Sequence, residues 1–177
     1  MKKELIITKD SSHSLFVPTL NETYHSKNGA ITESMHIFIK NGIQYHLKNN
    51  LAILEVGFGT GLNTVLTLEN SKNKTVNYTT LEPHPITKSI YSNLNYYSFT
   101  KSDKNTFLKI HTSNWEEEIE LSKNFTLFKS KKKYKILYLK KNMILYILMH
   151  LLLINNQICG NKISLKSAFI YLTKMGF

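Results

Sequence analysis

The sequence has no arginine, so all 23 basic residues are lysine, and its only cysteine is Cys159. One cysteine excludes an intramolecular disulfide and fits a reducing compartment. The longest apolar run, Met143–Ile154, has 12 residues and includes His150, whereas a membrane span needs about 20. The N-terminal segment has too short an apolar run for a signal-peptide core. We therefore expect a cytoplasmic protein that has no membrane partner.

Acidic residues are absent from the last part of the chain. All 12 Asp and Glu residues precede residue 121, and Lys129–Phe177 holds 10 lysines and no acid. Residues 1–128 contain 13 lysines and 12 acids, so the net charge of +11 belongs almost wholly to the later segment. A basic chain suggests a nucleic-acid partner, and a non-catalytic basic RNA-binding protein is one hypothesis. The many Asn, Ile and Lys residues also indicate an A/T-rich gene, which explains part of the lysine excess and weakens the RNA-binding hypothesis.

The order of apolar patterns favours an α/β fold. Leu51–Val56 is a largely apolar run that ends at a cluster of glycines, as buried parallel strands do. Leu62–Ser71 has apolar residues at helical spacing, and Val76–Glu82 predicts a second strand. Strand, helix and strand in this order predict a parallel sheet.

Other segments give weaker signals. Residues 1–20 look irregular, and His36–Ile43 alternates as a strand does and contains an Asn-Gly turn signal. Pro85 is suited to the first turn of a helix that continues to about Asn95. The acidic segment Asn114–Leu121 predicts the start of another helix.

The segment that carries most information has glycines at every second position: Gly57, Gly59 and Gly61. This G-x-G-x-G spacing differs from the G-x-G-x-x-G of dinucleotide sites. The preceding Glu55 would repel a pyrophosphate but suits the cationic methionyl part of S-adenosylmethionine. The resulting E-x-G-x-G-x-G resembles the first motif of class I methyltransferases. A tight turn that binds no ligand is the alternative.

The physics of such a segment supports a nucleotide site. Glycines let the backbone turn sharply and approach a ligand closely, and the helix that follows presents free N–H groups. Glu82 ends the second predicted strand, 21 residues after Gly61. A carboxylate at that point can accept hydrogen bonds from two ribose hydroxyls.

Segments around the turn resemble one methyltransferase family. They are Glu22–Gly42, Leu54–Leu68 and Tyr78–Pro85, with a looser fit over Phe107–Leu121. They are similar to the MnmC/MnmD family, which finishes 5-methylaminomethyl-2-thiouridine at the tRNA wobble position and occurs alone or fused to a flavin oxidase. The resemblance covers roughly residues 5–130. It implies a Rossmann-like class I fold, S-adenosylmethionine as cofactor and the tRNA anticodon loop as partner.

The resemblance also implies residue roles. Glu82 would hold the ribose hydroxyls. Tyr24 and Ser26 would close over the cofactor or the incoming base, with a packed tyrosine and a turn serine as the alternatives. The residues that would line the methionine and ribose, after Glu55 in the strand, are Gly57, Phe58, Gly59, Thr60, Gly61, Leu62 and Asn63.

No metal site is expected. The spacing of His25, His36 and His84 fits no metal-binding pattern. Trp115 is interpreted as a core residue, with a platform for base stacking as the alternative. No catalytic residue is assigned.

The family's acceptor motifs, D-A-F-A-P followed by P-[DE]-M-W, are absent from the printed sequence. Permitted codons for Lys141–Asn161, read from the last nucleotide of each codon, allow the string KYDIIYFDAFAPNKQPDMWEQ, which contains both motifs. We therefore hypothesise a frameshift within Lys129–Lys133, where lysine codons form a tract prone to slippage. A divergent helix lying on a membrane is the alternative.

Together these observations predict residues 1–130 as the N-terminal part of a methyltransferase domain and residues 131–177 as an aberrant lysine-rich tail. The sheet is then incomplete, and the chain keeps half of the cofactor site without the acceptor half. We expect such a chain to be inactive. A class I methyltransferase with another acceptor is a further hypothesis.

Overall fold

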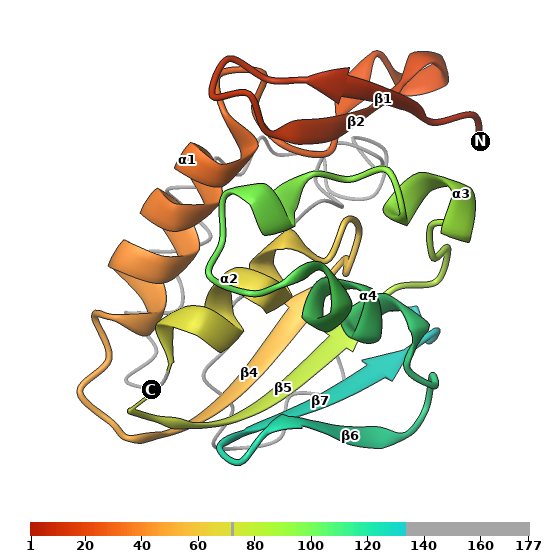
Figure 1. Cartoon of the computed structure of the whole chain (residues 1–177). Helices are drawn as coiled ribbons and strands as arrows, with labels where there is room; N and C mark the ends of the chain where they lie inside the picture. Colours follow the sequence, from red (N-terminus) through yellow and green to blue (C-terminus); the bar gives the residue numbers. More distant parts are fainter. Residues whose placement is uncertain (72, 134–177) are drawn as a thin grey trace, which may run out of the picture.

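The computed structural model describes residues 1–71 and 73–133 and contains a four-stranded sheet (Figure 1). Three strands are parallel, β4 (Asn50–Val56), β5 (Thr75–Leu81) and β7 (Phe125–Ser130), and β6 (Glu118–Ser122) pairs antiparallel with β7. The order is β4-β5-β7-β6, so β4 and β6 are the edge strands of the described part. Both predicted strands and their parallel pairing are confirmed, within a mixed sheet.

The strands differ in how deeply they are buried. Along β5, the buried Val76 and Tyr78 alternate with the exposed Thr75 and Asn77. Residues 53–56 of β4 are all buried, on both faces of the strand. Since side chains alternate between the faces of a sheet, the carboxyl end of β4 lies inside the domain, where it leads into the glycines.

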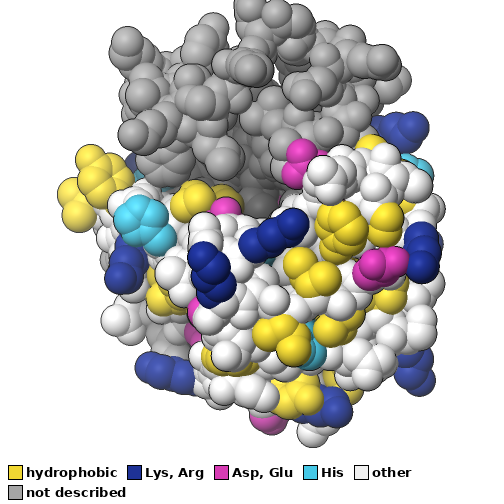
Figure 2. All heavy atoms as spheres, turned by 90° about the horizontal axis from the view of Figure 1, so that it is seen from above, with side chains coloured by type: hydrophobic (Ala, Val, Ile, Leu, Met, Phe, Trp, Pro, Cys, Tyr) yellow, Lys and Arg dark blue, Asp and Glu magenta, His cyan; other side chains and the backbone are white. Residues whose placement is uncertain are grey.

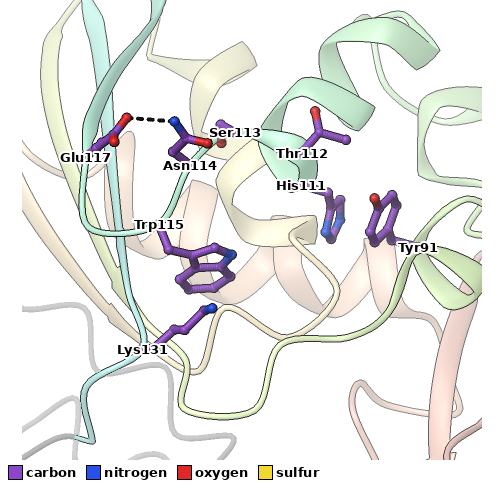
Figure 3. A pocket seen from close by; sticks show the side chains of 8 residues that line it. All are labelled: Tyr91, His111, Thr112, Ser113, Asn114, Trp115, Glu117 and Lys131. Atoms are coloured by element: carbon purple, nitrogen blue, oxygen red, sulfur yellow. Dashed lines mark hydrogen bonds between the residues drawn. The ribbon is translucent and has the colours of Figure 1, made fainter.

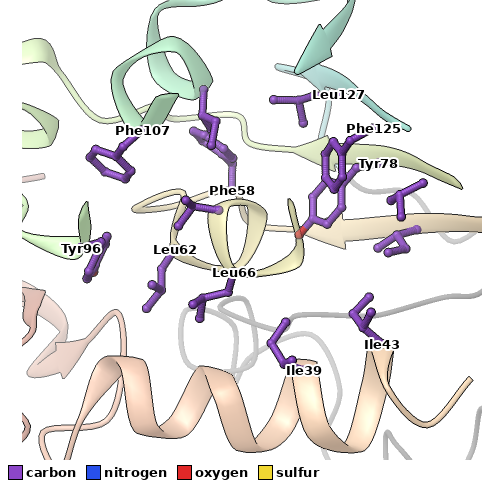
Figure 4. Close-up of a cluster of buried hydrophobic side chains, with 14 of the residues drawn as sticks. Ile39, Ile43, Phe58, Leu62, Leu66, Tyr78, Tyr96, Phe107, Phe125 and Leu127 are labelled. Atoms are coloured by element: carbon purple, nitrogen blue, oxygen red, sulfur yellow. The ribbon is translucent and has the colours of Figure 1, made fainter. Parts of the chain in front are cut away.

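Three of the described helices cover one face of this sheet (Figure 1). They are α1 (Ala30–Ser34), which continues as η2 (Met35–Ile43), α2 (Leu62–Asn70) and α4 (Lys104–Thr112). The predicted helix over residues 62–71 is confirmed as α2. Apolar side chains from the helices and the sheet meet in one core (Figure 4), which includes Ile39, Ile43, Phe58, Leu62, Leu66, Tyr78, Tyr96, Phe107, Phe125 and Leu127.

The strand predicted at His36–Ile43 is wrong, because these residues form the helical segment η2. Ile39 and Ile43, four residues apart, are buried on the side that faces the core, which is a helical spacing. The backbone N–H of Gln44 donates to the carbonyl of Ile39 at 2.9 Å, five residues back. This is the wide winding of a π-helix, and its period is easily mistaken for alternation.

The prediction of an irregular first segment, residues 1–20, is also wrong. A small antiparallel sheet lies there, in the order β1-β2-β3. Its strands are too short to give a clear pattern, and the turn between the first two uses Ser11 at a φ of 66°. The elements of this segment are β1 (Glu4–Ile7), β2 (His13–Val17), η1 (Pro18–Leu20) and β3 (Glu22–Thr23).

The helix expected to start at Pro85 is shorter than predicted. It is α3 (Lys88–Tyr91), preceded by Thr87 in an extended conformation, and η3 (Tyr96–Ser98) follows it. Residues 83–87 form a loop instead. Because Thr87 is extended, it cannot belong to the helix, which therefore begins at Lys88 rather than at Pro85.

The helix predicted from Asn114–Leu121 is wrong, since the chain enters strand β6 there. Glu116 has a φ of 64°, which a helix does not allow. Ile119 packs against the core between Glu118 and Glu120, which are exposed. The acidic residues thus belong to the outer face of an edge strand.

Among the described residues, no helix has the length and apolar character that crossing a bilayer requires. The described residues end at Lys133, so the tail that we interpret as frameshifted lies almost wholly outside them. The division at residues 130 and 131, the hidden reading frame and the alternative of a membrane-lying helix therefore stay predictions.

Candidate functional site

The glycine turn, residues 57–61, connects the carboxyl end of β4 to the N-terminus of α2. Gly57, Gly59 and Gly61 have φ angles of 92°, 51° and 72°. Residues with a Cβ disfavour this region of backbone conformation. The alternating glycines in the sequence therefore reflect three positions at which this turn needs them.

Neighbouring side chains also leave little room for a Cβ at two of these positions. A Cβ on Gly59 would lie 3.3 Å from a ring carbon of Tyr24, and a Cβ on Gly61 would lie 2.9 Å from Nε2 of His111. Tyr24 follows β3, and His111 lies in the last turn of α4. Burial raises the pKa of the Tyr24 hydroxyl, and the charge of Glu82 raises it further. The turn is therefore packed tightly from two sides.

Glu82 lies beside the turn, as the sequence predicted. Its Oε2 accepts a hydrogen bond from the backbone N–H of Gly59 at 3.1 Å, and its Oε1 accepts one from the N–H of His84 at 2.9 Å. The side chain is partly exposed. Because each carboxylate oxygen can accept more than one hydrogen bond, both oxygens keep the capacity to accept from the hydroxyls of a ligand.

Glu55 lies beneath the turn and has a different environment. Its side chain is fully buried, with Asn63 Nδ2 at 3.4 Å and Thr64 Oγ1 at 3.5 Å from its two oxygens. Burial raises the pKa of the Glu55 carboxyl to about 8, against hydrogen bonds that lower it, and the charge of Glu82 adds to the rise. Burial therefore favours the neutral acid at Glu55, which makes it a weaker source of negative charge than its place in the sequence suggests.

The other side chains of the turn point inward. Phe58, Thr60, Leu62 and Asn63 are 3%, 1%, 0% and 3% exposed. Phe58 packs edge-on against the rings of His111 and Trp115. A ligand at this turn would therefore meet the backbone, including the N–H groups at the start of α2, rather than these side chains.

Ser26 has the contacts of a turn serine. Its Oγ accepts a hydrogen bond from the backbone N–H of Asn28 at 3.1 Å, and its own N–H donates to Oε2 of Glu33 at 2.9 Å. Tyr24 contacts the glycine turn directly, whereas Ser26 shapes the loop that follows it. The two residues, predicted as a pair, therefore have different contacts.

Two histidines hold Thr60, and the sequence did not indicate either as a site residue. Nε2 of His25 lies 2.8 Å from Thr60 Oγ1, and Nε2 of His111 lies 3.1 Å from the carbonyl oxygen of Thr60. Since a carbonyl only accepts, His111 carries a proton on Nε2. Burial lowers the pKa of His111 to about 3, and the charge of Lys129 lowers it further, so His111 is neutral near pH 7. In the sequence, the one hint was that His111 directly follows the partly apolar stretch Phe107–Ile110.

A cavity of about 660 Å³ lies beyond His111 (Figure 3). The Tyr91 and His111 rings are stacked, with centroids 4.6 Å apart. Trp115 packs against the core, as predicted, and Lys129 Nζ lies 4.8 Å from its ring. The cavity is lined by Tyr91, His111, Thr112, Ser113, Asn114, Trp115, Glu117 and Lys131.

Lys129 is a buried cation at the end of β7. Its Nζ donates to the carbonyls of Ile110 and His111 at 2.8 and 3.0 Å, which are the final carbonyls of α4. Burial lowers the pKa of Lys129 to about 8. This lysine therefore joins α4 to the sheet.

Residues 1–71 and 73–133 contain no group of three His, Cys, Asp or Glu residues that could hold a metal ion. On the face seen in Figure 2, most lysine side chains are spread around the rim among uncharged and apolar ones. The described residues on this face form no continuous basic patch, and most of the tail lysines on which the RNA-binding alternative depends lie outside the described residues.

No family model matches the chain, but the chain is similar to a curated protein and to a solved structure. A curated relative is the tRNA 5-methylaminomethyl-2-thiouridine biosynthesis bifunctional protein MnmC from Burkholderia multivorans, which is 29% identical over 42% of this chain and 13% of its own length. The chain thus spans a small part of that relative. The crystal structure of MnmC2 from Aquifex aeolicus has a TM-score of 0.50 at 24% identity, over 72% of this chain and 41% of that one.

These two findings agree with the resemblance noted in the sequence. The structural likeness supports an α/β methyltransferase-like fold, and the sequence likeness points to the same group of proteins. The chain is therefore similar to an MnmC protein over part of its length, and its fold resembles that of MnmC2.

Proposed function

We propose that this chain is the cofactor-binding part of a cytoplasmic, S-adenosylmethionine-dependent methyltransferase that acts on the 5-aminomethyl group of the tRNA wobble uridine. The observation that carries the proposal is the glycine turn, with three positive φ angles, beside a carboxylate that accepts from the N–H of Gly59. The likeness to MnmC proteins supports the tRNA acceptor.

The residues present fit this cofactor. Gly59 lets the backbone approach a ligand, and Glu82 is oriented by two N–H groups to accept from ribose hydroxyls. The Tyr24 ring packs against the turn at Gly59. The N–H groups at the start of α2 suit the carboxylate of a methionine moiety. When bound, S-adenosylmethionine supplies an electrophilic methyl group.

On the acceptor side, the aminomethyl nitrogen must be neutral to attack, and the wobble base must leave the anticodon stack. The aspartate motif suited to orient this amine is absent from the printed sequence, and permitted codons allow it in the shifted frame. We propose that residues 1–130 are the N-terminal part of the methyltransferase domain and that residues 131–177 are an aberrant tail. The printed chain then binds its cofactor weakly and does not turn over.

The cofactor proposal is tested by calorimetric titration of the full chain with S-adenosylmethionine. We expect weak, saturable binding that Glu82→Gln reduces about tenfold, since it weakens charge-assisted hydrogen bonds. Glu118→Gln is the matched control, because Glu118 is exposed on the edge strand β6. Absence of binding by the wild-type chain, or equal losses in both variants, would contradict the proposal.

The acceptor proposal is tested by peptide mapping of the protein from its native source across Lys129–Phe177. Peptides that contain YDIIYFDAFAP, or a close variant, would mean that the cell makes the complete enzyme. Peptides that match NMILYILMHLLLINNQICGNK would mean that the printed tail is real. We then expect no methyl transfer to tRNA that carries 5-aminomethyl-2-thiouridine, and measured turnover by this chain would overturn the proposed inactivity.

The same experiments separate the alternatives. A basic RNA-binding protein would retain tRNA affinity after Glu82→Ala, and this affinity would fall steeply with salt. A methyltransferase with another acceptor would bind S-adenosylmethionine and lose that binding after Glu82→Ala. Its complete form would leave the hypomodified tRNA unmethylated.

A further inference from the structure

Thr60, at the centre of the glycine turn, contacts two histidines from distant parts of the chain. His25 Nε2 lies 2.8 Å from its hydroxyl oxygen, and His111 Nε2 lies 3.1 Å from its carbonyl oxygen. All three residues are buried, with 1% of Thr60 and 8% of each histidine exposed. The histidines therefore contact this residue where water has little access.

These contacts fix the backbone of the turn. The carbonyl of Thr60 and the N–H of Gly61 belong to one planar peptide unit. His111 holds the carbonyl end, and the N–H end donates to the carbonyl of Phe58 at 2.9 Å. The preceding glycine, Gly59, donates its N–H to Glu82 at 3.1 Å. Two peptide groups of the turn, Phe58–Gly59 and Thr60–Gly61, are therefore held by specific partners.

The histidine on the N-terminal side is itself anchored. The backbone N–H of His25 donates to Oγ of Ser14 at 3.0 Å, and the N–H of Tyr24 donates to the carbonyl of Leu15 at 2.7 Å. Both acceptors belong to β2. The bond between His25 and Thr60 therefore connects the small N-terminal sheet to the turn and keeps the Tyr24 ring over it.

We propose that His25 and His111 are positioning residues, which hold Thr60 and thereby preorganise the glycine turn for its ligand. The inference rests on the proposed function only for the identity of the ligand. Neither histidine belongs to the glycine motif, and each acts through Thr60 rather than on a substrate. Preorganisation improves affinity because the free protein already has the bound conformation.

The first test compares Thr60→Val, which removes the hydroxyl and keeps the shape, with Thr60→Ser, which keeps the hydroxyl. Hydrogen exchange of the turn amides is measured in the ligand-free full chain, and thermal melting shows that both variants fold. We expect exchange about tenfold faster in Thr60→Val and near the wild-type rate in Thr60→Ser, since one lost hydrogen bond corresponds to about that factor. Equal exchange in both variants would overturn the proposal.

The second test is a double-mutant cycle with His25→Leu, with His25→Gln as the variant that keeps a hydrogen-bonding side chain. We expect the effects of Thr60→Val and His25→Leu to be non-additive, because either change removes the same bond. Additive effects would contradict the role of His25.

For His111, His111→Leu should accelerate hydrogen exchange of the Gly61 amide, and His111→Gln should restore much of its protection. Equal exchange rates in the two variants would contradict the positioning role of His111.

Binding of S-adenosylmethionine to the same variants separates this inference from the proposed function. Faster exchange in Thr60→Val without any binding by the wild-type chain would leave the positioning role standing and refute the cofactor. Binding that is equal in wild type and Thr60→Val, together with unchanged exchange, would refute the positioning role and leave the cofactor standing. If both proposals hold, the Kd for S-adenosylmethionine rises about tenfold in Thr60→Val.

Discussion

The two sides of the glycine turn each contain a glutamate, and their environments are opposite. Beneath the turn, Glu55 is fully buried and protonated up to about pH 8. Above it, Glu82 is partly exposed and accepts hydrogen bonds from the N–H groups of Gly59 and His84. The turn therefore has a structural carboxyl group on one side and, on the other, a carboxyl group that is accessible to a ligand.

This comparison shows that an acidic residue in a binding motif need not supply charge. The electrostatic argument for a cationic ligand near Glu55 requires a carboxylate, and burial favours the neutral acid. At Glu82, the backbone N–H groups stabilise the acceptor in place, so the function expected from its position is compatible with its surroundings.

The largest effect is expected from Glu55→Ala. It leaves a cavity beneath the turn and removes the partner of Asn63 and Thr64, so the free energy of unfolding should fall by about 2–4 kcal/mol. Urea denaturation of the full chain measures this. A loss below 1 kcal/mol would mean that Glu55 is not the structural member of the pair.

Next in size is Glu82→Ala, which should act on binding rather than on folding. Loss of hydrogen bonds to a charged acceptor should weaken S-adenosylmethionine binding by about 1.5–3 kcal/mol, whereas unfolding should change by less than about 1 kcal/mol because the side chain is partly exposed. Calorimetric titration and denaturation of the same preparation test both halves. If Glu82→Ala lost as much free energy of unfolding as Glu55→Ala, the two glutamates would not differ in their roles.

A smaller effect is expected in the pH dependence of stability. The pKa of Glu55 is raised from 4.5 to about 8 on folding, so its contribution is fully present below pH 4.5 and is lost as pH rises through about 8. Between pH 6.5 and 8, the wild-type chain should lose up to about 1.4 kcal/mol per pH unit through this group. Glu55→Gln should remove that slope, and a slope that persists would show that Glu55 is ionised.

The smallest net effect is expected between pH 4.5 and 6.5. Here the pKa of His111 is lowered from 6.5 to about 3 on folding, so its contribution is present above pH 6.5 and is lost as pH falls. This opposes the slope from Glu55, and the wild-type free energy of unfolding should be nearly flat. In Glu55→Gln the free energy of unfolding should rise with pH, and in the double variant with His111→Asn it should again change little. A different result in either variant would contradict the assignments of Glu55 and His111.

Sequence patterns that extend over several consecutive residues predicted the structure well. β4, α2 and β5 follow from long apolar runs and from the glycines between them, and Glu82 follows from its position at a strand end. The π-wound η2 was misread because its apolar spacing in the sequence also suits a strand. Strand β6 was misread because its glutamates mark an exposed face, which a helix and a strand both have.

The contacts of the site were harder to predict, because they depend on pairs that lie far apart in the chain. Thr60 looked like a lining residue, and only the fold shows that its hydroxyl and carbonyl face His25 and His111. The protonation of Glu55 likewise follows from burial that no local pattern reveals.

The separation of these partners along the chain has a consequence for folding. His25 lies 35 residues before Thr60, and His111 lies 51 residues after it. Contacts between distant residues form slowly, because the loop-closure entropy must be overcome before they stabilise the chain. We therefore expect the glycine turn to reach its held form only after the chain between His25 and His111 has folded. A ligand that binds this form would then report that both long-range contacts are in place.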